Sequence, residues 1–169
     1  MACNFFLKKY RREPEKTDEL LGICDPEGEL CAYTTTDSNC PDRWCAWIKN
    51  TIRKRIVFIP IDKNMDIRRP NGEKEKLCDG MIYGTDTREL SFVELKEYHT
   101  GGYLGEAIEQ LESTLRVFLA CHNYQDYSNR NAYVCNPVRP HFKSSYREIS
   151  SEFRKKYKFR LLTQAEIVF

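Results

Sequence analysis

Two short segments in the middle of the chain are rich in aliphatic and aromatic residues and are separated by a polar turn. Residues 78–84 and 90–96 have the composition of β-strands, and the polar residues 85–88 lie between them. These segments predict a β-hairpin. If the turn is centred between residues 86 and 87, Met81 faces Phe92 across the two strands.

The same register brings two acidic side chains together. Asp79 faces Glu94, with Cβ atoms roughly 5 Å apart, and the alternation of side chains along a strand places Lys96 on the same face. Two opposed carboxylates repel unless a proton or a cation lies between them, and Mg²⁺ binds one or two carboxylates together with waters and phosphate oxygens. This spacing predicts a nuclease centre in which Asp79 and Glu94 bind a divalent metal. Lys96 would orient water or stabilise transition-state charge.

The segments after the hairpin predict alternating helices and strands. Apolar residues at helical spacing follow the Gly101-Gly102 pair, and on this helix Gln110 and Thr114 share a face that could point toward a phosphate or a water. Ser145 and Glu148 have the spacing of a capping box and predict a second helix that ends near residue 157. Strands are predicted at 51–61, where Pro60 indicates an edge or a strand end, and at 131–135 and 158–162. The predicted fold class is α/β, with a mixed central β-sheet flanked by helices.

The first fifty residues give a weaker pattern. Residues 15–23 and 41–49 are interpreted as helices and residues 34–39 as a loop. With 169 residues and 41% hydrophobic content, the chain is long enough for one substantial core. We predict a single domain over residues 1–169, with a poorly defined part at 1–50 and a core at 51–162.

These motifs resemble the PD-(D/E)xK nuclease superfamily, which includes many restriction endonucleases, RecB-like nucleases and Holliday-junction resolvases. The resemblance covers roughly residues 50–135 and depends on Asp79, on Glu94-Leu95-Lys96 and on the helix that carries Gln110. One departure is that Cys78 occupies the position of the proline that gives the superfamily its name.

The resemblance implies a restriction-endonuclease-like core and assigns further roles. It implies that Asp79 and Glu94 bind Mg²⁺ or Mn²⁺, that Lys96 assists catalysis, that Gln110 lines the site, and that the carbonyl oxygen of Leu95 is a further metal ligand. Many members carry an additional acid on an amino-terminal helix, for which Glu19 is the first candidate here and Asp42 the second. Members of this size often act as homodimers or beside a helicase or specificity partner.

Eight cysteines allow a different metal chemistry. Cys24, Cys31, Cys40 and Cys45 cluster before the predicted hairpin and are an alternative site for zinc or an iron-sulfur cluster, although no Cys-x-x-Cys pair occurs. No stretch approaches the length of a membrane span, and residues 1–12 resemble neither a secretory signal nor an anchor. A cytoplasmic location with reduced thiols and no membrane partner is therefore expected.

Charge indicates local rather than global contact with nucleic acid. The net charge is only +2, but basic residues cluster at several places, and such clusters contact phosphates in a salt-dependent way. The clusters are Lys8-Lys9-x-Arg11-Arg12, Arg53-Lys54-Arg55, Arg68-Arg69 and Arg154-Lys155-Lys156, and we predict nucleic-acid contacts for Arg53, Arg55, Arg68 and Arg69. No glycine-rich phosphate loop is present, and His99, His122 and His141 are too far apart for a local motif.

The sequence thus predicts a Mg²⁺- or Mn²⁺-dependent nuclease that hydrolyses phosphodiester bonds, in DNA rather than RNA. The alternative is a non-catalytic nucleic-acid-binding or protein-interaction module on a nuclease-like scaffold, in which the acidic pair has no catalytic role.

Overall fold

The computed structural model describes residues 3–39, 41–96, 102–137 and 146–169. Within these ranges, no helix has the length and apolar character needed to cross a membrane. The helices are α1 (Tyr103–Cys121) and α2 (Tyr146–Tyr157). The strands are β1 (Leu20–Cys24), β2 (Tyr33–Thr35), β3 (Ala46–Lys49), β4 (Ile56–Pro60), β5 (Gly80–Gly84), β6 (Glu89–Leu95), β7 (Asn129–Cys135), β8 (Arg160–Thr163) and β9 (Glu166–Val168).

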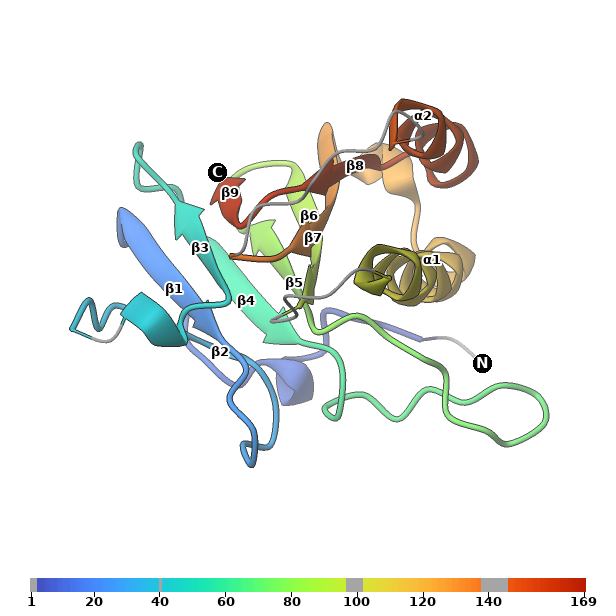
Figure 1. The fold of residues 1–169 in the computed structure, drawn as a ribbon, viewed down its shortest axis with the longest axis horizontal. Coiled ribbons are helices and arrows are strands. Elements are labelled where there is room, and N and C mark those ends of the chain that lie inside the picture. Colours follow the sequence, from blue (N-terminus) through green and yellow to red (C-terminus); the bar gives the residue numbers. More distant parts are fainter. Residues whose placement is uncertain (1–2, 40, 97–101, 138–145) are drawn as a thin grey trace.

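The strands form two mixed sheets, and the fold is α/β. The five-stranded sheet has the order β4-β5-β6-β7-β8, antiparallel from β4 to β6 and parallel from β6 to β8. The four-stranded sheet has the order β2-β1-β3-β9, with only β3 and β9 parallel. Figure 1 shows α1 and α2 on one face of the five-stranded sheet and the smaller sheet on its other side.

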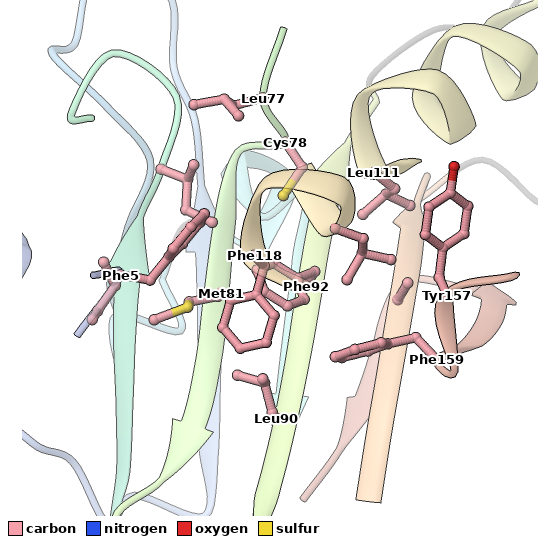
Figure 2. Packing of buried hydrophobic residues seen from close by; sticks show 14 of the residues in the cluster. Phe5, Leu77, Cys78, Met81, Leu90, Phe92, Leu111, Phe118, Tyr157 and Phe159 are labelled. Atoms are coloured by element: carbon pink, nitrogen blue, oxygen red, sulfur yellow. The ribbon is translucent and has the colours of Figure 1, made fainter. Parts of the chain in front are cut away.

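Side chains of the five-stranded sheet alternate between two hydrophobic cores. Met81 and Phe92 point toward the helices and pack with Leu111 and Phe118 of α1, as Figure 2 shows. The intervening residues of β5 and β6, with those of β7, pack instead against the small sheet in a core that includes Leu21, Ile48, Ile82, Val93, Tyr133 and Ile167. Both faces of the five-stranded sheet are therefore covered, which is why β5 and most of β6 are buried.

The predicted hairpin register is confirmed. Met81 pairs with Phe92 and Gly80 pairs with Val93 in an antiparallel ladder. Asp79 lies one residue before β5, so the register carries it to the level of Glu94. Asp79 is followed by a glycine because the chain passes close to β4 here: a Cβ atom at Gly80 would lie 2.6 Å from the ring of Phe58.

The elements on either side of the hairpin agree with the prediction, apart from their exact ends. The helix α1 begins after Gly102, whose φ of 107° lies in the left-handed region that favours glycine. Pro60 is the last residue of the edge strand β4, as its missing N–H requires. The helix predicted to end near residue 157 is α2, although Ser145 of the proposed capping box lies outside the described residues.

The helices predicted in the first fifty residues are wrong. The segment 15–23 contains the start of β1, and the segment 41–49 contains a three-residue 3-10 helix followed by β3. The predicted loop at 34–39 begins inside β2. These strands are short, and β3 pairs with β9 at the far end of the chain, so tertiary pairing decides their conformation.

Candidate active site

The central strand β6 carries two charged residues at its carboxyl end. Glu94 lies between β5 and β7, and only 1% of its surface is exposed. Lys96 follows the strand, where its backbone amide donates to the carbonyl of Cys135 at 2.8 Å, so the chain is still held in the sheet. The Nζ atom of Lys96 lies 2.9 Å from Oε1 of Glu94. The predicted glutamate and lysine therefore meet as a buried ion pair.

Asp79 is held beside this pair by the backbone of β6. The amide of Leu95 donates a hydrogen bond of 2.6 Å to Oδ2 of Asp79. This hydrogen bond occupies one of the two carboxylate oxygens of Asp79, each of which can accept. Leu95 thus positions the acid of one strand against the acid and lysine of its neighbour.

Gln110 of α1 completes the group. Lys96 Nζ donates to Gln110 Oε1 at 2.9 Å, and Gln110 Nε2 donates to the carbonyl of Leu77 at 3.4 Å. The helix side chain therefore links the lysine to the segment that leads into β5. The four residues that the sequence predicted as catalytic, Asp79, Glu94, Lys96 and Gln110, lie within one connected set of contacts.

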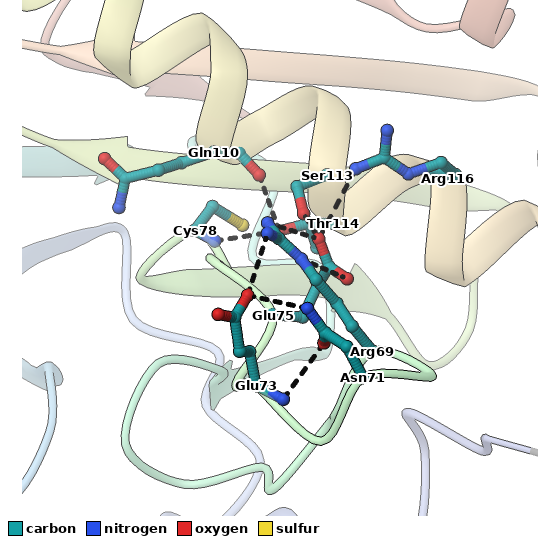
Figure 3. Close-up of polar contacts among 9 residues, drawn as sticks. All are labelled: Arg69, Asn71, Glu73, Glu75, Cys78, Gln110, Ser113, Thr114 and Arg116. Atoms are coloured by element: carbon teal, nitrogen blue, oxygen red, sulfur yellow. Dashed lines mark hydrogen bonds and ion pairs between the residues drawn. The ribbon is translucent and has the colours of Figure 1, made fainter.

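Thr114 does not point toward a phosphate. It is fully buried, and its hydroxyl accepts from the backbone N–H of Cys78 at 2.8 Å and donates to the Gln110 carbonyl at 2.9 Å. Figure 3 shows Cys78, Thr114 and Gln110 together where α1 meets this segment. The contact also explains the absence of proline at position 78, because proline has no N–H to donate to Thr114.

One oxygen of Glu94 has no partner in the part of the chain that the structure describes. Oε1 contacts Lys96, whereas Oε2 is buried and makes no hydrogen bond with any of the described residues. A buried carboxylate oxygen without a partner is costly unless it is protonated or binds a cation. The Oε2 atom of Glu94 therefore favours either a proton or a bound cation.

The pKa values of Glu94 and Asp79 indicate the same preference. Burial and, after it, the charge of Asp79 raise the pKa of Glu94 to about 9, against the opposing effect of Lys96. Burial also raises the pKa of Asp79 to about 7, although the Leu95 amide acts in the other direction. Near neutral pH the two carboxyl groups together retain a proton, which a cation between them would displace.

Two further acids, which the sequence interpretation missed, contribute to the field at this site. The charge of Asp62 raises the pKa of both Asp79 and Glu94, and the charge of Asp25 raises that of Asp79. Asp62 directly follows the segment predicted as a strand, and its amide donates to the carbonyl of Cys78 at 3.2 Å. An antiparallel β4–β5 pair places the end of one strand beside the start of the next, so Asp62 could have been found. Asp25 follows β1, which was misinterpreted as a helix.

The segment before β5 is fastened to α1 by Glu75, whose side chain is only 9% exposed (Figure 3). Its Oε1 atom lies 3.3 Å from a guanidinium nitrogen of Arg69 and 3.4 Å from one of Arg116, and it accepts a hydrogen bond from Ser113. Burial raises the pKa of Glu75, but these hydrogen bonds and charges outweigh it and leave the pKa lowered. Glu75 therefore remains ionised, and its contacts hold the segment before β5 against α1, the helix that carries Gln110.

The chemistry of the site fits a hard divalent cation held by few protein ligands. Asp79 and Glu94 have carboxylate oxygens of the kind that such a cation binds, and among the described residues Oε2 of Glu94 has no hydrogen-bond partner. Among the described residues, no group of three or more His, Cys, Asp or Glu side chains is arranged to hold a metal ion. Mg²⁺ keeps several waters and needs only one or two carboxylates, so a two-carboxylate site is sufficient. The carbonyl of Leu95 as a further ligand stays a prediction.

Comparisons with models of protein families, with curated proteins and with solved structures find no match to this chain.

The two candidates for an additional acid, Glu19 and Asp42, are both exposed. Glu19 forms an exposed ion pair with Arg53 at 3.4 Å. Glu19 lies three residues after Lys16, which forms a β-bridge with Ile56 at the start of β4. Asp79 lies beside the other end of β4, because Pro60 pairs with Gly80. Asp42 lies in an exposed 3-10 helix on the side of the small sheet.

The four arginines predicted to contact nucleic acid are each paired with a carboxylate. Arg53 pairs with Glu19, Arg55 with Glu15 at 2.5 Å, Arg68 with Asp66 at 3.1 Å, and Arg69 with Glu75. Their positive charges are therefore locally compensated. Any contact of these residues with phosphates stays a prediction.

Three of the cysteines of the alternative metal site, Cys24, Cys31 and Cys45, lie in the small sheet and its loops. Cys24 ends β1, where it is buried and interacts with Tyr33, and Cys45 is buried directly before β3. Burial raises the pKa of Cys24 and of Cys31, which favours the neutral thiol over the thiolate that zinc binds. Cys40 lies outside the described residues.

Proposed function

We propose that this protein is a Mg²⁺- or Mn²⁺-dependent nuclease that hydrolyses phosphodiester bonds in DNA and is built on a restriction-endonuclease-like core. The observation that carries the proposal is the buried Oε2 atom of Glu94, which has no partner among the described residues although its carboxylate lies beside Asp79 and Lys96. A carboxyl group buried in a central strand needs a proton or a cation, and a cation beside an ordered lysine is suited to phosphate chemistry.

Each residue of the group has a distinct task in this proposal. Asp79 and Glu94 bind the cation, which supplies Lewis-acid activation of the phosphodiester. Lys96 has three N–H donors, of which two are directed to Glu94 and Gln110. Its third donor is available to orient the attacking water or to stabilise charge on a phosphate oxygen. Gln110 fixes the ammonium group of Lys96 and so keeps its third N–H in a constant direction.

Cleavage of supercoiled plasmid and of labelled single-stranded DNA, with Mg²⁺ or Mn²⁺, tests the proposal. The wild-type protein should cut at least one substrate, and Lys96→Ala should lose at least a hundredfold in rate. Lys74→Ala, which changes an exposed lysine in the loop before β5, is the matched control and should cut as wild type does. Glu94→Gln, purified in parallel, reports any contaminating nuclease. If the wild-type protein cuts neither substrate, or if Lys96→Ala cuts equally well, the proposed function is wrong.

Calorimetric titration with Mn²⁺ separates catalysis from the binding-only alternative. The nuclease proposal requires a Mn²⁺ site of millimolar or tighter affinity that Asp79→Asn removes. A non-catalytic scaffold would bind DNA without such a site.

A further inference from the structure

A basic groove lies between α2 and the outer edge of β8. It consists of two adjoining hollows, of about 610 and 370 Å³, that share Arg154 and Arg160. Lys155 lines the first hollow, and Arg130 and Lys158 line the second. No Asp or Glu side chain is among the described residues that line either hollow. This surface is named the α2–β8 groove.

The cations of the groove differ from the four arginines that the sequence predicted to contact nucleic acid. Among the described residues, Arg154, Lys155 and Arg160 form no ion pair with a carboxylate, whereas Arg53, Arg55, Arg68 and Arg69 all do. Arg130 is held rigidly by backbone carbonyls, at 2.9 Å from that of Lys158 and 3.1 Å from that of Tyr124. A carbonyl orients a guanidinium without cancelling its charge. The groove is therefore a concentrated positive field.

Helix stability explains only part of this pattern. Arg154 and Lys155 lie in the last turn of α2, where basic residues stabilise the helix macrodipole. Arg147, which also lines the groove, lies in the first turn, where a positive charge opposes the macrodipole. Arg130 and Arg160 belong to strands, to which the argument does not apply. Basic residues from three elements converge on one hollow surface.

We infer that the α2–β8 groove binds the phosphodiester backbone of nucleic acid. Neutral donors stand beside the cations, because Ser150 and Ser151 line one hollow and Asn129 and Asn131 the other, and hydroxyl and amide groups commonly join arginine in phosphate contacts. A lipid surface fits less well, because membrane-binding surfaces insert large apolar side chains. None of the exposed large hydrophobic residues among the described residues lines the groove.

The strands that carry the groove and the candidate active site are neighbours in the five-stranded sheet. Arg160 pairs with Asn131, and Asn131 pairs with Ser91, three residues before Glu94 on β6. Two strand spacings across the sheet and three residues along β6 place the Cα atoms of Arg160 and Glu94 roughly 14 Å apart. This span is about four base pairs of duplex. A role for the groove in holding substrate rests on the proposed nuclease function, whereas phosphate binding itself does not.

Fluorescence anisotropy with labelled single-stranded and duplex DNA, in EDTA and over a range of KCl concentrations, tests the inference without catalysis. Arg154→Ala/Arg160→Ala should raise Kd at least tenfold. It should also reduce the slope of log Kobs against log[KCl] by about 1.4 for single strands and about 1.8 for duplex. Arg154→Lys/Arg160→Lys preserves the charge and should stay within a few-fold of wild type. The matched control Arg43→Ala/Lys49→Ala removes two exposed charges on the small-sheet side and should change Kd less than twofold.

The inference is overturned if wild type does not bind DNA in EDTA, or if Arg154→Ala/Arg160→Ala binds as the Arg43→Ala/Lys49→Ala control does. Circular dichroism and thermal melting of each variant establish that the comparison is between folded proteins. Wild type that binds through the groove but cuts nothing with Mg²⁺ or Mn²⁺ supports the groove and contradicts the nuclease. Wild type that cuts, with KM and Kd unaffected in the groove variant, supports the nuclease and contradicts the groove.

Discussion

The amide of Leu95 donates a 2.6 Å hydrogen bond to Oδ2 of Asp79. The residue between Glu94 and Lys96 therefore holds the acid that precedes the neighbouring strand β5. This contact fixes Asp79 beside Glu94 in spite of their mutual repulsion. The fixed position has a measurable cost in the absence of metal, because burial raises the pKa of Asp79 to about 7.

Asp79→Asn should stabilise the metal-free protein in a pH-dependent way. Asparagine keeps an oxygen for the Leu95 amide but cannot ionise. In wild type, a carboxyl group whose folded pKa is raised contributes stability that is complete below its unfolded pKa near 4 and is lost as the pH rises through about 7. The advantage of Asp79→Asn should therefore be larger at pH 8 than at pH 5, by about 2 to 3 kcal/mol.

Urea unfolding in EDTA at the two pH values measures this difference. Asp66→Asn, at an exposed aspartate paired with Arg68, is the control and should show no such increase. An equal effect of Asp79→Asn at pH 5 and pH 8 would mean that Asp79 is already ionised at pH 5.

Gln110→Ala should lower the rate of cleavage without weakening metal binding. The substitution removes one of the two acceptors that orient the Lys96 ammonium group and leaves Asp79 and Glu94 in place. Loss of a partner that orients a functional side chain typically costs about tenfold or more in activity. Single-turnover cleavage measures the rate, and calorimetry with Mn²⁺ measures the affinity. Glu109→Ala, at the exposed neighbouring position of α1, should change neither. A Gln110→Ala protein that cuts as fast as wild type would remove Gln110 from the site.

Asp62→Asn should weaken Mn²⁺ binding several-fold, because the negative charge of Asp62 attracts the cation as it raises the pKa of Asp79 and Glu94. The same substitution at Asp66, four residues along the same loop, removes an equal charge and should leave the affinity within twofold of wild type. Titration of both variants at low and high salt distinguishes a local contribution from the net charge. If the two variants bind Mn²⁺ equally well, Asp62 takes no part in the site.

The site was more predictable from the sequence than the fold around it. Glu94, Lys96 and Asp79 lie on a hairpin whose partners are close in sequence, so alternation and a short turn were enough to fix the register of Met81 and Phe92. Gln110 was found because a strongly periodic helix follows the hairpin. Local patterns determine these relationships.

Elements that depend on distant pairing were missed. β3 pairs with β9 across more than a hundred residues, as Trp47 with Glu166, and neither strand is longer than four residues. Strands this short have too few positions to show alternation, and the core they share with β5 and β6 becomes visible only in three dimensions. Asp25 was missed for the same reason.

Phe5 gives the last prediction, because the amino-terminal segment was expected to be poorly defined and yet one of its side chains is fully buried. The centroid of its ring lies 5.4 Å from that of the Phe118 ring and 6.3 Å from that of the Phe92 ring, in the core between α1 and the sheet (Figure 2). Phe5→Ala should lower the free energy of unfolding by about 3 to 5 kcal/mol, through lost burial and the cavity left behind. Leu7→Ala, two residues away and 40% exposed, is the control and should cost less than about 1 kcal/mol. Urea unfolding of both variants tests this. A Phe5→Ala protein as stable as Leu7→Ala would show that the segment contributes little to the core, whereas the expected loss would make the first residues of the chain part of the support for β6, the strand that carries Glu94.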